Sequence, residues 1–170
     1  MDEILKTSDD IRRRIDELAA VITEDYKDVN GLQLISLLNG GSVFCSDLMR
    51  KIKIPTELHH FGFNSIPSND DTGSVEISLD VKESLFEKDI LLVEGLVITG
   101  RTPKYLLEYF SQRKPKSIEI CAIGIKPALV DSNLNVKYRL FDFNDEWVAR
   151  FGIGEGVQRS KDFLFDVRKN

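Results

Sequence analysis

The segment at residues 90–102 constrains the fold of this chain more than any other stretch. It opens with four consecutive apolar residues, with charged residues before them and Glu94-Gly95 after them, which is typical of a central parallel strand buried on both faces. A Thr-Gly-Arg-Thr loop follows at residues 99–102. Pro103 is a favourable first residue for a helix, which we expect at 103–112. The segment therefore predicts a strand, a short loop and a helix, in that order.

The rest of the chain alternates between helical and extended patterns. Ser8 precedes apolar residues at helical spacing from Ile11 to Ile22, which predicts a capped amphipathic helix reaching Tyr26. The remaining elements that we expect are strands at 32–38, 55–63, 75–79, 116–124 and 136–143, and a helix at 42–52. Such alternation predicts an α/β fold with a doubly wound, mainly parallel sheet, flanking helices, and sites beyond the carboxyl ends of the strands.

The length and the charge of the chain limit its class. With 170 residues it is long enough for one domain, residues 1–170, with a single apolar core. Its formal net charge is −5 and both signs are spread along the sequence, whereas nucleic-acid surfaces need clustered Lys and Arg, so we expect no nucleic-acid partner. No apolar stretch is long enough for a membrane span and the N-terminus is acidic, so we expect a cytoplasmic protein with no membrane partner.

The cysteines and histidines carry no sign of a reactive or metal-binding site. Cys45 and Cys121 each lie in an apolar run, which favours buried, reduced thiols over a disulfide. His59 and His60 have no Cys or carboxylate neighbour at a spacing that would complete a metal site. We therefore assign no metal ligand from these residues.

The loop at residues 99–102 has the chemistry of a phosphate site. Unpaired N–H groups of a glycine-containing turn ahead of a helix can surround a phosphate, and the helix dipole adds to the attraction. The groups would come from Thr99, Gly100, Arg101 and Thr102. Glu94, where the strand leaves the sheet, is the candidate for the hydroxyls of a phosphorylated sugar. The alternatives are simple helix capping by the loop and a solvent-facing charge at Glu94.

Residues 90–102 resemble the phosphoribosyl-pyrophosphate (PRPP) motif of type I phosphoribosyltransferases. In that motif four hydrophobic residues precede two acids, two apolar residues, an Asp and a Thr-Gly-x-Thr phosphate loop. Glu94 and the loop at 99–102 match, but the second acid is Gly95 and the later Asp is Ile98. The resemblance implies that Glu94 binds the ribose hydroxyls and that the loop binds the 5′-phosphate. Ile98 occupies the family's acid/base position and cannot accept a proton, so no catalytic residue is assigned.

A second stretch, residues 37–44, is similar to the pyrophosphate loop of the hypoxanthine-guanine phosphoribosyltransferases. Asn39 stands where that family has a lysine, and the resemblance implies that Asn39 and Gly40 bind pyrophosphate. Arg159 is similar in place to a later arginine that contacts pyrophosphate. The polar stretch 65–73 is a plausible lid, although the Tyr of the family's mobile loop is absent.

The purine would be held by two further motifs. Lys126, followed by Pro127, is similar to the family's lysine that recognises the 6-oxo group of the base. The alternative is a surface lysine in a turn. Residues 141–148 are similar to the segment that stacks an aromatic ring on the base, so Trp147 would be that ring and Val148 would offer a backbone group. A lone Trp is otherwise more often part of a core.

The resemblance implies a type I phosphoribosyltransferase fold with a small hood region. It also implies transfer of phosphoribosyl from PRPP to hypoxanthine or guanine in purine salvage, giving IMP or GMP, with Mg²⁺ as cofactor and a homodimer or tetramer. Gly95, Ile98 and Gly154 stand where the family has acids, so we expect weakened or altered turnover. The alternative is a non-catalytic purine-nucleotide-binding sensor or partner subunit. A DNA-binding regulator on this fold is disfavoured because no helix-turn-helix or basic extension is present.

Overall fold

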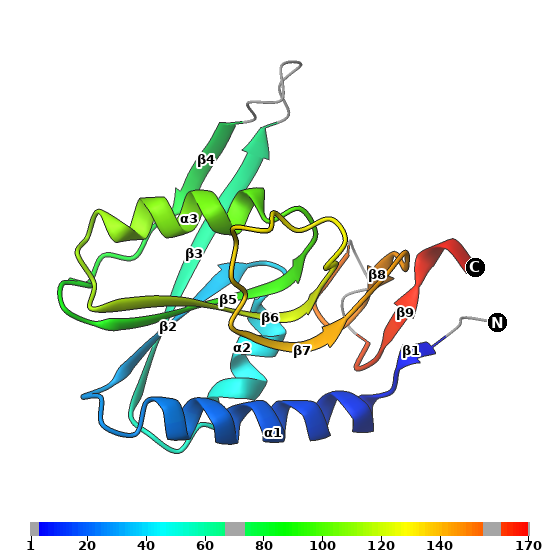
Figure 1. Cartoon of the computed structure of the whole chain (residues 1–170), viewed down its shortest axis with the longest axis horizontal. Helices are drawn as coiled ribbons and strands as arrows, with labels where there is room; N and C mark the ends of the chain where they lie inside the picture. Colours follow the sequence, from blue (N-terminus) through cyan, green and yellow to red (C-terminus); the bar gives the residue numbers. More distant parts are fainter. Residues whose placement is uncertain (1–3, 67–73, 155–160, 170) are drawn as a thin grey trace.

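The computed structural model describes residues 4–66, 74–154 and 161–169 (Figure 1). Its strands form a central six-stranded sheet and a small three-stranded sheet. In chain order the elements are β1 (Ile4–Lys6), α1 (Ser8–Asp25), β2 (Leu32–Leu38), α2 (Ser42–Met49), β3 (Thr56–Ile66), β4 (Ser74–Leu79), β5 (Asp89–Val97), α3 (Arg101–Ser111), β6 (Ser117–Ile125), β7 (Tyr138–Asp142), β8 (Val148–Ala149), β9 (Leu164–Asp166) and the 3-10 helix η2 (Val167–Lys169).

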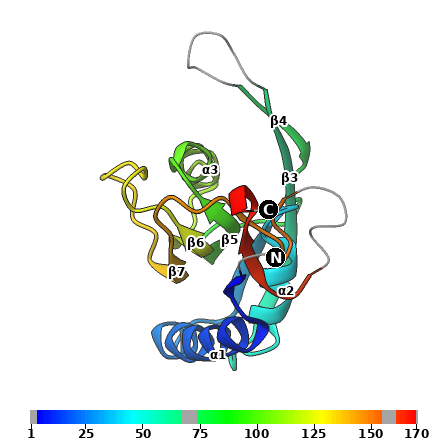
Figure 2. The same cartoon turned by 90° about the vertical axis from the view of Figure 1, so that its right-hand side faces the viewer.

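The central sheet has the strand order β4-β3-β2-β5-β6-β7. Every neighbouring pair from β3 to β7 is parallel, and β4 is antiparallel to β3. Helix α3 covers one face, whereas α1 and α2 cover the other (Figures 1 and 2). A mainly parallel sheet with helices on both faces confirms the predicted doubly wound α/β fold.

Strand β5 is buried on both faces, as its unbroken apolar run predicts. Leu91 and Val93 pack on the α1 and α2 side, whereas Ile90 and Leu92 pack on the α3 side. Full burial of each such side chain stabilises the fold by about 1.5–3 kcal/mol. The strand is thereby fixed in the middle of the sheet. It continues to Val97 in register with β6, so Glu94 lies within the strand and not, as predicted, where the strand leaves the sheet.

Helix α1 is capped by Thr7 rather than by the predicted Ser8. The Thr7 hydroxyl accepts a hydrogen bond from the Asp10 N–H at 3.2 Å, and the Asp10 carboxylate accepts one from the Thr7 N–H at 3.2 Å. This reciprocal arrangement needs an acid three residues after the cap, where Ser8 would have Ile11. The predicted apolar face is correct, because residues from Ile11 to Ile22 at helical spacing are buried.

The boundaries of several other elements differ from the prediction. Helix α3 begins at Arg101 rather than at Pro103, because Gly100 adopts a left-handed conformation with φ 81° and starts the helix there. Pro103 then lies in the first turn, where its missing N–H costs nothing. Helix α2 ends at Met49 rather than at residue 52, and β7 is shorter than the predicted 136–143.

The hairpin of β3 and β4 is longer than expected. β3 continues past residue 63 because Ser65 pairs with Val75 and Ile66 pairs with Ser74. The beginning of the expected lid at 65–73 is therefore strand, and its remainder, 67–73, lies outside the described residues. The hairpin projects away from the rest of the molecule (Figures 1 and 2).

The small sheet, β1-β9-β8, has no clear signature in the sequence. Its strands are two or three residues long, which is too short to reveal an alternating pattern. β9 pairs antiparallel with both neighbours and so joins the N-terminal strand to the segment after β7. The sheet lies on the side of the molecule toward which the central strands run (Figure 1).

Cys45 and Cys121 are buried and unpaired, which confirms the prediction of reduced thiols. Burial raises the pKa of the Cys45 thiol to about 12 and also raises the pKa of Cys121. Nucleophilic cysteines instead need a lowered pKa and access to solvent. In the part of the chain that the structure describes, no helix combines the length and apolar character needed to cross a bilayer.

Candidate functional site

The residues that the sequence singles out gather at the carboxyl ends of the central strands. Asn39 and Gly40 follow β2, the 98–102 loop follows β5, and Lys126 follows β6. Because β2, β5 and β6 are adjacent and parallel, their loops leave the sheet side by side at one edge. The small sheet, which contains Val148, lies on the same side of the molecule (Figure 1).

The turn after β2 lies directly on the backbone of β5. The Gly41 N–H donates to the Leu37 carbonyl at 2.9 Å, which closes the turn, and the peptide bond before Asn39 is cis. A Cβ built on Gly95 would lie only 2.9 Å from the Gly40 carbonyl oxygen. The backbone of the turn after β2 therefore contacts the backbone of β5 directly.

Glu94 is half-buried beside this turn. Its carboxylate accepts a hydrogen bond from the Gly95 N–H at 2.7 Å, and a Cβ built on Gly40 would lie 3.4 Å from the same carboxylate oxygen. Burial raises the pKa of Glu94 to about 7, and the hydrogen bond only partly offsets that effect. The alternative of a charge facing solvent at the end of the strand is therefore wrong.

The loop at residues 99–102 has a shape set by the segment after β6. The Asp131 N–H donates to the Thr99 carbonyl at 3.2 Å, and the Asp131 carboxylate forms an ion pair with Lys104 at 3.3 Å. Gly100 packs against Leu134 so closely that a Cβ would lie 2.5 Å from that side chain. The N-cap residue Gly100 has no side chain, and the Thr99 hydroxyl accepts a hydrogen bond from the Arg101 N–H at 3.4 Å, so part of this helix start is capped locally. Such a helix end can accept an anion.

An open cavity of about 740 Å³ lies between these loops and the small sheet. Its wall is mostly apolar, and the residues that matter for its chemistry are Ile98, Lys126, Leu129, Trp147, Val148 and Gly154. Four residues assigned from the sequence to one neighbourhood, Ile98, Lys126, Trp147 and Val148, thus line one space. A largely apolar cavity with one buried cation suits a flat, mostly apolar ligand that carries a hydrogen-bond acceptor.

Lys126 is the cation of this cavity. It is only 6% exposed, so the alternative of a solvated surface lysine is wrong. The backbone N–H of Lys126 donates to the Val97 carbonyl at 3.0 Å, and its backbone carbonyl accepts from the Leu129 N–H at 2.9 Å. These bonds fix the backbone, and the side-chain ammonium lies 6.0 Å from the centre of the Trp147 ring.

Trp147 presents its ring to solvent at the cavity. The side chain is 62% exposed, so the alternative of a core tryptophan is wrong. Its backbone is nevertheless fixed, because its N–H donates to the buried Asp166 carboxylate at 3.1 Å and its carbonyl accepts from the Val167 N–H at 3.0 Å. Hydrogen bonding from Arg168 helps to hold the pKa of Asp166 at about 2, so that this carboxylate stays ionised. An exposed ring on a fixed backbone is suited to stacking.

The comparison with known proteins identifies the family. A model described as "Phosphoribosyl transferase domain" matches residues 2–156. The chain belongs to the phosphoribosyltransferase family. The hypoxanthine-guanine phosphoribosyltransferase of Dictyostelium discoideum is 34% identical over 155 residues, which cover 89% of this chain and 86% of that protein. The hypoxanthine phosphoribosyltransferase of Escherichia coli K12 is 35% identical over 153 residues, with the same coverage.

Solved structures of this family share the whole fold. The hypoxanthine phosphoribosyltransferase of Trypanosoma cruzi, in complex with the product IMP, superposes with a TM-score of 0.89 at 27% identity over 97% of this chain and 94% of that one. A hypoxanthine-guanine phosphoribosyltransferase of Bacillus anthracis gives a TM-score of 0.87 at 26% identity and 98% coverage of both chains. The type I phosphoribosyltransferase fold is thereby confirmed.

Two residues that line the cavity of this chain could not be predicted from its sequence. Leu129 is 56% exposed and lies in a turn, where no periodicity marks it. Val167 reaches the cavity only because β9 pairs with β8. Arg159, which the resemblance assigns to pyrophosphate, lies outside the described residues.

Magnesium is the cofactor that the family resemblance implies, and the described residues do not fit a protein-held ion. Among them no group of three or more His, Cys, Asp or Glu side chains could hold a metal. Of the assigned site residues that the structure describes, Glu94 alone is a carboxylate, and burial raises its pKa to about 7, so it is fully ionised only above neutral pH. Gly95 and Ile98 offer no oxygen ligand from a side chain. We therefore derive no step through a metal.

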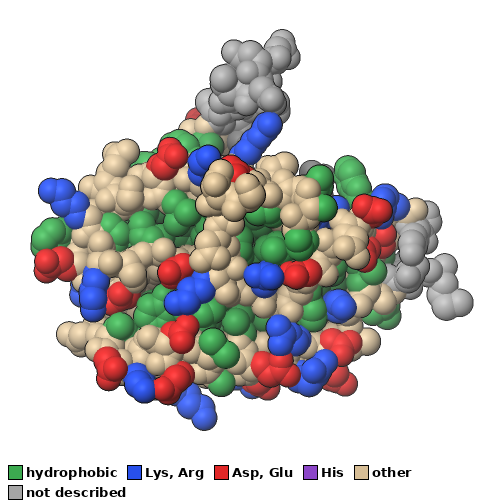
Figure 3. All heavy atoms as spheres, in the orientation of Figure 1, with side chains coloured by type: hydrophobic (Ala, Val, Ile, Leu, Met, Phe, Trp, Pro, Cys, Tyr) green, Lys and Arg blue, Asp and Glu red, His purple; other side chains and the backbone are tan. Residues whose placement is uncertain are grey.

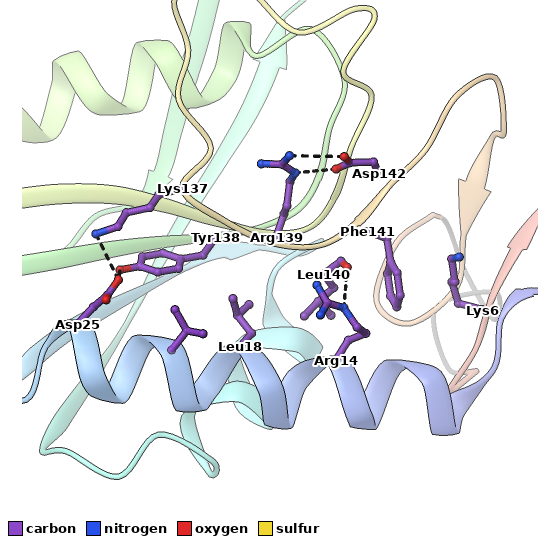
Figure 4. A pocket seen from close by; sticks show the side chains of 11 residues that line it. Lys6, Arg14, Leu18, Asp25, Lys137, Tyr138, Arg139, Leu140, Phe141 and Asp142 are labelled. Atoms are coloured by element: carbon purple, nitrogen blue, oxygen red, sulfur yellow. Dashed lines mark hydrogen bonds and ion pairs between the residues drawn. The ribbon is translucent and has the colours of Figure 1, made fainter.

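A second cavity of about 650 Å³ lies between α1 and β7, away from these loops (Figure 4). Its charged groups are already paired: Arg139 lies 2.6 Å from Asp142, and Asp25 accepts from the Tyr138 hydroxyl at 2.6 Å. Arg14 donates to the Leu140 carbonyl at 3.1 Å, which covers part of the open edge of β7. Charged side chains along a sheet edge protect it from pairing with another chain.

Opposite charges are also interspersed elsewhere on the surface. On the face shown in Figure 3, Lys and Arg side chains alternate with Asp and Glu. On α1, for example, Arg13 lies 3.4 Å from Asp10 and 3.5 Å from Glu17. Exposed pairs of this kind contribute only about 0–1 kcal/mol each, so they affect solubility more than stability.

Proposed function

We propose that this protein transfers the phosphoribosyl group of PRPP to a 6-oxopurine, hypoxanthine or guanine, in purine salvage. The observation that supports the proposal most is the cavity beside the 99–102 loop that holds the buried Lys126 and the exposed Trp147. In it the Lys126 Nζ lies 6.0 Å from the centre of the Trp147 ring. The two family members named above from Dictyostelium discoideum and Escherichia coli, both enzymes of this class by name, support the same reaction.

In this proposal the base lies flat against Trp147, and Lys126 donates to its 6-oxo group. A hydrogen bond from a charged donor contributes about 1.5–3 kcal/mol, which is more than a neutral one. Stacking on an aromatic ring adds about 0.5–1.5 kcal/mol. Val148 offers a backbone group to the edge of the ring, and Ile98 and Leu129 provide apolar walls.

The sugar and its phosphates occupy the loops beside the cavity. We assign the 5′-phosphate to Thr99, Gly100, Arg101 and Thr102, and the pyrophosphate to Asn39, Gly40 and Arg159. Glu94 is assigned to the ribose hydroxyls. With a pKa of about 7 it is close to half ionised near neutral pH, so it can both accept hydrogen bonds from a hydroxyl and donate one.

The reaction breaks the bond between the anomeric carbon and pyrophosphate and forms a bond from that carbon to a ring nitrogen of the base. It passes through an oxocarbenium-like state, as in glycoside hydrolysis. Pyrophosphate leaves with the electron pair, and the base gives up its N–H proton. Ile98 cannot accept that proton, and loss of such a group typically slows a reaction by about 10²–10⁴-fold. We therefore propose slow turnover, with the proton passing to water.

A second candidate is a nucleotide-binding sensor or partner subunit. It is favoured by the absence of an acid at both Gly95 and Ile98 in a chain in which Lys126 and Trp147 still line one cavity. We further propose, from the family resemblance, that the protein works in the cytoplasm as a homodimer or tetramer and that its Mg²⁺ arrives with PRPP. Light scattering during size-exclusion chromatography measures the oligomeric state.

The test is to incubate the purified protein at high concentration with PRPP, Mg²⁺ and hypoxanthine, guanine or xanthine in turn, and to follow nucleotide and pyrophosphate by chromatography. Product with hypoxanthine or guanine supports the transferase. No product, together with a melting temperature that rises with IMP or GMP, supports the sensor. No product and no effect of either nucleotide contradict both.

A further inference from the structure

Three glycines from different parts of the chain meet at one carbonyl oxygen. A Cβ built on Gly95 would lie 2.9 Å from the Gly40 carbonyl oxygen and 3.0 Å from its carbonyl carbon. From the other side, a Cβ built on Gly152 would lie 3.3 Å from the same oxygen. The Gly40 carbonyl is therefore held between the end of β5 and the 150–154 turn, with no room for a side chain toward β5.

The next residue of the turn makes an even closer approach. A Cβ built on Gly41 would lie 2.1 Å from the Val93 carbonyl oxygen. The turn thus contacts the backbone of β5 at Val93 and again at Gly95. In both places backbone meets backbone and no flexible side chain can move aside, so an added Cβ at Gly95 would have to displace the turn from β5.

This geometry gives Gly95 a structural role. The PRPP motif that residues 90–102 resemble has an acid at that position, and the sequence alone presents Gly95 as a lost acid. In the structure any side chain at position 95 would push the Gly40 carbonyl away from β5. The close contact between the Asn39–Gly41 turn and β5 therefore requires a residue without a side chain at position 95.

We propose that Gly95 is a positioning residue, which sets how deeply the Asn39–Gly41 turn rests on β5 and so where the turn presents its N–H groups to pyrophosphate. The inference rests on the proposed function, since it assigns the turn to PRPP. In the described part of the chain, no backbone hydrogen bond from the N–H of Asn39 or Gly40 is found. Such N–H groups in a turn are suited to an anion.

The 150–154 turn links this contact to the base cavity only indirectly. Arg150 and Ile153 hydrogen-bond to each other, with their N–H groups donating at 2.8 and 3.0 Å, and Gly154 follows at the cavity wall. A shifted Gly40 carbonyl would press on Gly152, but the Lys126 and Trp147 side of the cavity is held by separate hydrogen bonds. The effect of Gly95 should therefore fall on pyrophosphate and not on the base.

The experiment compares Gly95→Ala and Gly95→Asp with the wild-type protein, using calorimetric binding of PRPP, inorganic pyrophosphate and IMP. We expect both variants to bind PRPP and pyrophosphate at least about tenfold more weakly, which is 1.4 kcal/mol. Binding of IMP, which has no pyrophosphate, should change by less than about threefold. The control is Gly31→Ala at the opposite end of β2, where φ is 90° and alanine is strained without touching the site.

A second measurement needs no ligand. Amide chemical shifts of Gly40 and Gly41 should change in Gly95→Ala and stay unchanged in Gly31→Ala. If the wild-type protein binds PRPP and IMP, and Gly95→Asp binds PRPP as tightly as the wild type does, the inference alone is overturned. Unchanged shifts of Gly40 and Gly41 in Gly95→Ala overturn it as well. A wild-type protein that binds neither PRPP nor IMP overturns the proposed function, and the inference falls with it.

Discussion

The base cavity and the neighbouring loops that we assign to PRPP are built differently. In the cavity, Lys126 is buried as a fixed cation and Trp147 is an exposed ring on a fixed backbone. At the end of β5, one carboxylate remains, Glu94, and Gly95 and Ile98 stand where the family has acids. Because Ile98 lines the same cavity as Lys126 and Trp147, the comparison indicates that a proton-accepting group can be absent while the neighbouring groups that we assign to the base remain.

The largest expected effect is a gain of turnover in Ile98→Asp. Ile98 is 43% exposed at the cavity, so a carboxylate there can remain hydrated and accept the proton of the base. We expect the rate of nucleotide formation to rise by about 10²–10⁴-fold. Steady-state assays with hypoxanthine measure it, and Ile98→Asn, which cannot act as a base, is the control. Equal rates for both variants would show that proton transfer is not what limits this protein.

Ile98→Asp is more informative alone than in combination with an acid at position 95. An Asp at position 95 would collide with the Gly40 carbonyl, so a loss of binding there would hide any gain at position 98. Ile98 is 43% exposed at the cavity, so position 98 can be changed alone.

The next effect concerns the pH dependence of stability. Burial raises the pKa of Glu94 from 4.5 to about 7, so the folded state favours the protonated form. The contribution of Glu94 to the stability of the fold is complete below about pH 4.5 and is lost as the pH rises through about 7. The free energy of unfolding should fall by up to about 3 kcal/mol over this range. Urea unfolding at acidic and mildly alkaline pH measures the loss. Glu94→Gln should reduce the pH dependence in this window, and a variant with the slope of the wild type would contradict the raised pKa of Glu94.

Removal of the cation should weaken base binding selectively. Lys126→Met keeps the length of the side chain and removes the ammonium, so it should cost about 1.5–3 kcal/mol in the binding of IMP, or about 10–150-fold in affinity. Calorimetry measures the affinity, and binding of pyrophosphate to the same variant is the control. Equal weakening of both ligands would mean that Lys126 supports the whole site and not the base alone.

The smallest effect is expected for the stacking ring. Trp147→Ala should weaken IMP binding by about 0.5–1.5 kcal/mol, and Trp147→Phe, which keeps an aromatic face, should lose less. Because the ring is 62% exposed, neither change should lower the melting temperature as a core substitution would. A large drop in melting temperature for Trp147→Ala would contradict the role of an exposed platform.

The elements that could be predicted from the sequence are those whose signal is local. β5 carries an unbroken apolar run, and α1 carries a helical apolar face, so both were predicted in place. Thr7 was missed as the cap because its partner is Asp10, and the small sheet was missed because its strands are too short for a pattern. Val167 could not be assigned to the cavity, since only the pairing of β9 with β8 brings it there.

The same limit applies to the chemistry. The family resemblance, and not spacing alone, implied roles for Lys126, Trp147 and Ile98 near the base, and the structure places the three around one cavity. The role of Gly95 could not be predicted, because it depends on the Gly40 carbonyl, which approaches from a different strand. A residue that matters by having no side chain is visible only when its neighbours in space are known.

The most direct test of the account measures binding and turnover on the same wild-type sample. Calorimetric titration with IMP is followed by a single-turnover reaction of excess protein with PRPP, Mg²⁺ and hypoxanthine. The account predicts saturable IMP binding together with slow nucleotide formation that Ile98→Asp accelerates. Absence of IMP binding, or fast turnover that Ile98→Asp does not increase, would contradict the separation of base binding from proton transfer.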